Sequence, residues 1–239
     1  MVRSDAREPR LGLGKVMAPG GESVPRGALP FWRGMLYTAR SSRPKARPML
    51  VLLLGLVLFL GVHSATILGV KPQLVQKYGV RTYMLAYTAA SLIGLVLIFY
   101  GFGLYRQTAW MQIWTPPRGM NHLAILLMLF AMIALATTWL PGEIKRRLKH
   151  PMLVAVKIWA LAHLLANGDL GGMILFGALL AWAVALRIVL KRAQPGARMA
   201  IAPGWAANDW LAVGAGTAVW AAIVLYLHRA LIGVSVLGG

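Results

Sequence analysis

Histidine is the residue type in this chain that is best suited to bind a metal or to carry a proton inside a membrane. The sequence has five histidines and no cysteine, so thiolate ligands and disulfides are excluded, and imidazole and carboxylate remain as ligands. His163 lies in an apolar run that also holds Lys157 and Asn167. An ionisable group without a partner costs about 2.5 kcal/mol or more at the centre of a membrane helix, so such groups normally face a bundle interior or a site. His163 is therefore the first candidate functional residue.

The surroundings of His163 on a helix favour a flat ligand. Residues three and four positions away share its face, and the broadest of these side chains is that of Trp159. Ala160 and Ala166 are small, while Asn167 follows one turn later and could orient a contact to the site. The sequence therefore predicts an imidazole among small side chains, beside one aromatic ring.

The other histidines differ in their predicted depth in the membrane. We call the side on which the first apolar run begins side A, and the opposite side B. At a rise of about 1.5 Å per residue, His63 falls in the B half of its run and His163 in the A half of its own. The remaining three lie at run ends, where water or headgroups can satisfy a histidine, and are alternates: His150 on side B, with His122 and His228 on side A.

The composition is that of a membrane protein. Hydrophobic residues make up 59% of the 239 residues, and charged residues only 13%. The net charge of +19 might suggest a nucleic-acid partner, but ten of the 25 basic residues precede residue 48 and most others lie in short loops between apolar runs. This distribution is typical of a membrane protein, with lipid and not nucleic acid as its partner.

Six apolar runs predict an all-α integral membrane protein, a compact bundle of about six transmembrane helices. Each run approaches the ~20 residues that a helix needs to cross a bilayer. They lie at about 49–69, 82–103, 121–140, 151–168, 170–190 and 209–232. Residues 1–48 are basic and show no periodicity, which predicts a disordered extension or a mis-assigned start before a membrane domain at 49–239.

Small and charged residues in these runs predict where the helices pack closely and how two of them end. Small residues spaced by four predict close helix contacts, namely Ala86, Ala90 and Gly94 in the second run, and Ala212 and Gly216 in the sixth. A carboxylate favours a helix N-terminus, so Asp209 is expected to cap the sixth run. Arg187 is expected to extend its charge past the end of the fifth run.

Haem is the cofactor that these histidines suggest. Iron in haem accepts histidine ligands, and the macrocycle fits between the helices of a bundle. The chain has no CxxCH motif, so attachment would be noncovalent, as in a b-type haem. Isolated membrane histidines also serve proton relays and quinone sites, and these alternatives stay open. No HExxH zinc motif, phosphate-binding loop or carboxylate pair is present.

Four segments in order resemble the NnrU family over about residues 49 to 237. They occupy 55–64, 145–152, 162–169 and 227–234, and read GLVLFLGVHS, KRRLKHPM, AHLLANGD and LHRALIGV. The resemblance implies a multi-pass protein of the bacterial inner membrane, associated with denitrification and nitric oxide metabolism. The family shares its domain with 15-cis-zeta-carotene isomerase, a haem b enzyme whose histidine ligands match His63 and His163. The cysteine of that isomerase near the second ligand falls at about Ala160, so a thiolate switch is absent here.

The resemblance thus implies a haem b protein with His63 and His163 as iron ligands and as catalytic residues, and with Trp159 and Asn167 beside the cofactor. One expected activity is cis-trans isomerisation of an apolar polyene, for which one histidine must leave the iron. The other is electron transfer to quinone or to a respiratory or denitrification complex. The competing class is a non-catalytic accessory or assembly protein. Helix rise separates the two histidines by about 10 Å in depth, which helix tilt would have to reduce.

Overall fold

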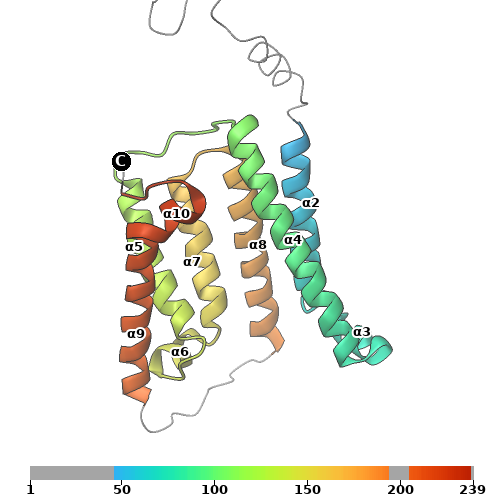
Figure 1. Ribbon diagram of the computed structural model, residues 1–239. Coiled ribbons are helices and arrows are strands. Elements are labelled where there is room, and N and C mark those ends of the chain that lie inside the picture. Colours follow the sequence, from blue (N-terminus) through green and yellow to red (C-terminus); the bar gives the residue numbers. More distant parts are fainter. Residues whose placement is uncertain (1–45, 194–204, 238–239) are drawn as a thin grey trace, which may run out of the picture. The chain divides into compact units, whose positions relative to one another are not determined.

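The structure, a computed structural model, describes residues 46–193 and 205–237 (Figure 1). Almost all of the predicted extension at 1–48 therefore lies outside the described residues. The described chain is helical, and its apolar helices run back and forth alongside one another (Figure 1). The fold begins with α2, which spans Ala46–His63.

Six apolar helical segments correspond to the six predicted runs, which confirms an all-α membrane fold. They are α2, α4 (Val80–Thr108), α5 (Met120–Ala136), α7 (Pro151–Ala166), α8 (Leu170–Ala193), and α9 (Trp205–Ala222) with its continuation through η1 (Ile223–Leu227) and α10 (His228–Ile232). Three of these segments are long and apolar enough to cross a bilayer by length and composition: Val80–Thr108, Leu170–Ala193 and Ala206–Ile232. The other three are shorter.

Two short polar helices lie in segments that the sequence analysis treats as loops. The first is α3 (Lys71–Tyr78), which begins with a proline in its first turn, where the missing N–H costs nothing. The second is α6 (Glu143–Leu148). The first apolar run was also predicted too long, because α2 ends at His63. There the Ser64 hydroxyl donates to the Leu60 carbonyl at 2.7 Å, and the chain continues in turns to Gly69, whose φ is +68°.

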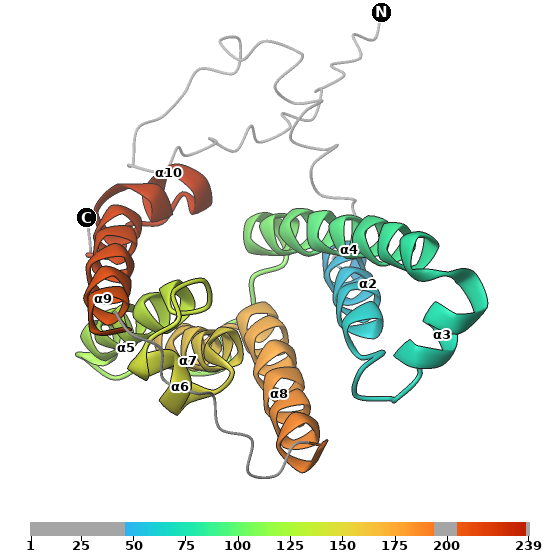
Figure 2. The ribbon, with the colours of Figure 1, turned by 90° about the horizontal axis from the view of Figure 1, so that it is seen from below.

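The helices pack in a defined order of neighbours. Helix α4 lies along α2, α8 contacts both α2 and α7, and α5 contacts α7 on one side and α9 on the other (Figure 2). A buried apolar core joins α2, α4, α7 and α8 through Leu52, Leu56, Ile98, Ala160, Leu175, Phe176 and Leu179. Large apolar side chains such as Val57 and Leu85 are exposed on the outer faces, at 72% and 66%. Exposed apolar surface on this scale is expected where lipid is the solvent.

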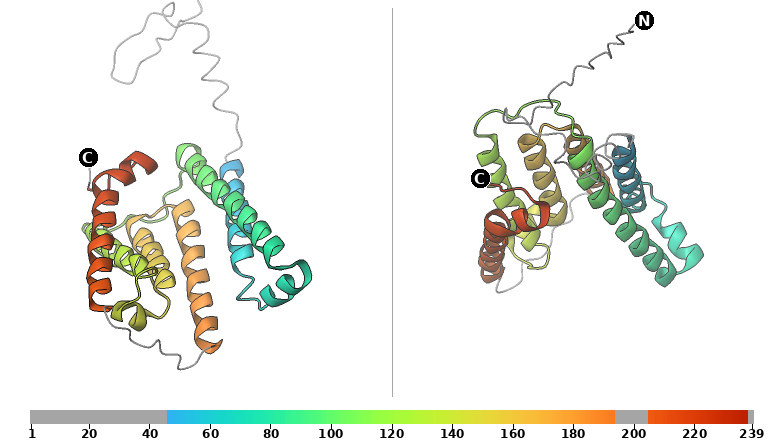
Figure 3. Two further views of the ribbon diagram at one scale, coloured as in Figure 1. Left: turned by 60° about the horizontal axis from the view of Figure 1, so that its bottom comes forward. Right: turned by 45° about the horizontal axis from the view of Figure 1, so that its top comes forward.

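Small residues set the closest helix contacts, though not all of those predicted. A methyl group on Gly94 would lie 2.8 Å from the Phe59 backbone nitrogen, and one on Gly216 would lie 2.6 Å from Cα of Ile133. Ala212 is fully buried. These three predictions are confirmed. The prediction for Ala86 is wrong, because this residue is exposed. Helix α4 has 29 residues and α2 has 18, so α4 continues past its shorter neighbour (Figure 3).

Two carboxylates cap helices. Asp169 is buried, and its Oδ1 accepts from the Gly172 N–H at 2.8 Å in the first turn of α8. The prediction that Asp209 caps its own helix is wrong. The chain is already helical at Trp205, so Asp209 lies inside α9. Its carboxylate instead accepts from the backbone N–H groups of Glu143 and Ile144, which begin α6.

Candidate functional site

His163 lies near the side A end of α7, and its ring is held by backbone and by aromatic neighbours. Its Nδ1 is 2.8 Å from the Trp159 carbonyl oxygen. Because a carbonyl only accepts, Nδ1 carries the proton and Nε2 of the neutral ring keeps its lone pair. The ring stacks on Phe176 of α8, with centroids 4.4 Å apart and planes 28° apart. The His163 ring is thus held in one orientation, and Nδ1, not Nε2, makes its hydrogen bond to the described residues.

Trp159 and Asn167 both act on His163 through the backbone of α7. The carbonyl of Trp159 fixes the imidazole, and its indole packs edge-on against Phe176 with ring centroids 5.1 Å apart. The side-chain amide of Asn167 donates to the His163 carbonyl at 2.8 Å. Asn167 therefore closes the last turn of α7. Ala160 is fully buried in the core one turn before His163.

His63 is the last residue of α2, in a second aromatic pocket built by three helices. Its Nδ1 is 2.7 Å from the Phe59 carbonyl, so its Nε2 is also free to accept or to ligate. The imidazole lies 4.2 Å from the Phe59 ring, 5.0 Å from that of Tyr87 on α4 and 5.8 Å from that of Trp182 on α8. The indole nitrogen of Trp182 is buried and has no hydrogen-bond partner. The aromatic side chains around His63 therefore include an indole N–H without a partner among the described residues.

The two predicted ligands approach different residues of α8. His163 stacks on Phe176, whereas His63 meets the edge of Trp182 at 88°. These two α8 residues are six positions apart, which is about 9 Å at the ~1.5 Å helical rise. This separation agrees with the depth difference of about 10 Å that helix rise predicts for His63 and His163. Their role as a ligand pair stays a prediction.

The three alternate histidines lie at helix ends, as predicted. His122 is exposed in the first turn of α5, and His150 immediately precedes α7. His228 begins α10 directly after the π-helical turn η1, and its Nδ1 is 2.8 Å from the Val234 carbonyl. The described residues contain no group of three or more histidine and carboxylate side chains arranged to hold a metal ion.

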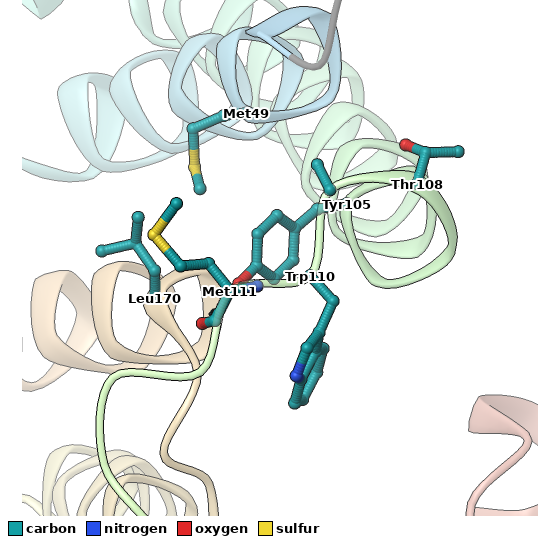
Figure 4. A pocket seen from close by; sticks show the side chains of 7 residues that line it. Met49, Tyr105, Thr108, Trp110, Met111 and Leu170 are labelled. Carbon is teal, nitrogen blue, oxygen red and sulfur yellow. Dashed lines mark hydrogen bonds between the residues drawn. The ribbon is translucent and has the colours of Figure 1, made fainter. Parts of the chain in front are cut away.

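A separate pocket of about 310 Å³ opens on side A near the start of α2 (Figure 4). It is lined by Met49, Tyr105, Thr108, Ala109, Trp110, Met111 and Leu170. The buried Tyr105 hydroxyl donates to the Met111 carbonyl and accepts from its N–H, so its polar atom is already bonded. The pocket is mainly apolar and has no histidine in its lining. Sequence patterns do not reveal this pocket, because the loop after α4 forms it by folding against Leu170, whose N–H donates to the Met111 carbonyl.

These features define an all-α membrane protein in which two half-buried histidines, each anchored through Nδ1, lie among aromatic side chains at two levels. The chain belongs to the NnrU family, because the model of the NnrU protein family matches residues 51–236. The match agrees with the four segments that carry the resemblance. Searches among curated proteins and among solved structures found no match.

Proposed function

We propose that this protein binds haem b noncovalently in a bacterial inner membrane that it crosses several times, and that His163 and His63 are the residues that would hold the iron. The observation that carries the proposal is the anchoring of His163. Its Nδ1 is bonded to the Trp159 carbonyl and its ring is stacked on Phe176, so Nε2 is left free in a fixed direction. A metal-binding histidine typically donates its other ring N–H in this way, which fixes the tautomer and the ring.

The donor set fits a b-type haem. Both predicted ligands are imidazoles with a free Nε2, and the chain has no cysteine that could form a covalent attachment or a thiolate ligand. Phe176 and Trp159 beside His163 provide the apolar, aromatic surroundings that a macrocycle favours. When bound, the haem would supply an iron that either contacts an unsaturated substrate or exchanges an electron.

The two predicted ligands differ in how firmly the protein holds them: His163 would be the fixed ligand and His63 the releasable one. His163 is held within α7, between the Trp159 carbonyl and the Phe176 ring, so it would be the ligand that keeps its position. His63 is the last residue of α2 and is followed by turns, so it can leave at a lower conformational cost. Exposed apolar faces let a polyene or a quinone approach from the bilayer. In the redox version of the proposal, the partner is a respiratory or denitrification complex.

One observation favours a second candidate function, a non-catalytic accessory or assembly protein. His63 and His163 contact residues of α8 that are six positions apart, and each ring is already packed against aromatic side chains. Both histidines would then have structural roles, or they would carry protons. A purified protein without haem would support this second function.

The test is an absorption spectrum of the full chain, purified in mild detergent, together with single alanine substitutions at the five histidines. We expect a b-type haem spectrum that His163→Ala abolishes or turns high-spin, and that His63→Ala turns high-spin. His122→Ala is the matched control, because this residue is exposed at the end of α5, and it should leave the spectrum unchanged. A normal six-coordinate spectrum in His63→Ala, with loss in His228→Ala, would replace the pair by His163 and His228 on side A.

A further inference from the structure

Positive charge gathers on side B where α7 begins, in a set of residues that we call the side B cluster: Lys149, His150 and Arg187. Helix α8 continues to Ala193, so Arg187 lies about 9 Å before its end at the ~1.5 Å rise per residue, and it is half-buried. The charge of Arg187 acts on His150 from the neighbouring helix, and that of Lys149 acts on it from the same turn. Burial is the largest cause of a lowered pKa of His150, and the charges of Arg187 and Lys149 lower it further. Helices α7 and α8 pack against each other in opposite directions, and His163 stacks on Phe176, so Arg187, eleven positions after Phe176, lies close to the level of the α7 start.

Every carboxylate in the described ranges 46–193 and 205–237 is bonded elsewhere. Glu143 accepts from Arg146 at 2.6 Å and from Arg147 at 2.8 Å. Asp209 accepts from the backbone at the start of α6, and Asp169 is buried at the opposite end of α8. A half-buried arginine at a membrane edge is costly without a counter-charge. The described part of the chain does not supply one for Arg187.

The backbone between α6 and α7 positions this cluster in a tight turn. Among the residues that the structure describes, Lys149 is the one non-glycine residue with a positive φ, at +62°. The next residue, His150, donates its N–H to the Leu148 carbonyl at 2.7 Å. A lysine in this region of φ is strained, so the turn must be held by its surroundings. It leaves the Lys149 side chain exposed beside the start of α7.

We propose that the side B cluster binds the phosphate of an anionic phospholipid headgroup, with Arg187 and Lys149 as its cationic contacts. Arginine can bind a phosphate through two parallel hydrogen bonds, and lysine adds a compact charge. Basic pockets between membrane helices bind anionic headgroups in this way. Apolar side chains next to the cluster are exposed and would contact the acyl chains: Met152 on α7, with Val184 and Ile188 on α8. These exposed apolar side chains favour a lipid over free phosphate. The inference does not depend on haem.

The experiment titrates fluorescently labelled phosphatidylglycerol into the full-length protein in a non-ionic detergent. Unlabelled phosphatidylglycerol, phosphatidylcholine and inorganic phosphate serve as separate competitors. We expect phosphatidylglycerol to compete and the other two to compete weakly. A charge near the membrane surface contributes about 1 kcal/mol, so Arg187→Gln and Lys149→Gln should each weaken binding about fivefold. Arg187→Lys, which keeps the charge, should retain most of the affinity.

Lys77→Gln is the matched control, because Lys77 is an exposed side B lysine on α3, away from the cluster. An equal loss of affinity in Lys77→Gln would overturn the site in favour of general surface charge. Equal competition by phosphatidylcholine would overturn the requirement for an anion, and equal competition by inorganic phosphate would overturn the lipid. If Arg187→Gln does not fold, the exposed Lys149→Gln variant decides the question by itself.

Discussion

The carboxylate of Asp209 accepts a hydrogen bond of 2.9 Å from the backbone N–H of Glu143, 66 positions earlier in the chain. The other carboxylate oxygen accepts from Ile144 at 3.1 Å. Asp209 thus caps the N-terminus of α6, although it belongs to α9. Through these two bonds the last apolar helix holds the basic helix that precedes α7.

The Asp209 contact should be measurable as stability. Removal of a capping carboxylate typically costs about 1 kcal/mol, so Asp209→Ala should lower the unfolding temperature of the protein in detergent. Asp209→Asn, which keeps an oxygen acceptor, should lose less. The measurement is thermal unfolding followed by circular dichroism. An unchanged unfolding temperature in the alanine variant would show that the contact contributes nothing.

A pH dependence follows from Glu143. Hydrogen bonds from Arg146 and Arg147 lower the pKa of its carboxyl from 4.5 to about 2. A lowered pKa means that the folded state favours the ionised form, so the stabilisation is complete above 4.5 and is lost as pH falls towards 2. The protection of the α6 amides against hydrogen exchange, measured relative to the intrinsic exchange rate at each pH, should therefore fall across this window. In Glu143→Gln, exchange should be faster at neutral pH and lack that change, and a wild-type slope in this variant would assign the effect to another group.

Gly216 should tolerate no side chain, whereas Gly214 on the same helix should. A methyl group on Gly216 would lie 2.6 Å from Cα of Ile133, while one on Gly214 would meet nothing within 4 Å. Forcing a group into a packed contact costs about 1–3 kcal/mol, so Gly216→Ala should lower the unfolding temperature. Gly214→Ala should leave it unchanged or raise it slightly, because alanine favours the helix. Equal effects in the two variants would disprove close packing of α5 and α9.

The protein should remain in the membrane fraction after washes with high salt and with carbonate. Its net charge of +19 could hold a peripheral protein on anionic lipid, but salt screens that attraction and does not weaken the burial of apolar helices. Immunoblots of the pellet and the supernatant after each wash measure the distribution. Release by salt alone would mean that the apolar helices do not enter the bilayer.

The sequence alone determined the class of fold and the approximate position of every apolar helix. This was possible because an apolar run of sufficient length is a local property, which the bilayer converts into a helix whatever its neighbours. The side of the membrane on which each histidine lies also followed, since helix rise is constant. The anchoring of His63 and His163 to carbonyls four residues earlier is equally local. The family match depends on the same linear information.

The tertiary structure decided which residues meet across helices. Asp209 accepts hydrogen bonds from α6 because α9 packs against α6. The spacing of residues in the sequence does not predict a contact over 66 positions. Arg187 lies level with the start of α7 because α8 continues past it and packs beside that helix. The levels of Phe176 and Trp182 on α8 likewise set the separation between the two histidine pockets. Such contacts depend on the direction and packing of whole helices, which apolar periodicity within a single helix does not specify.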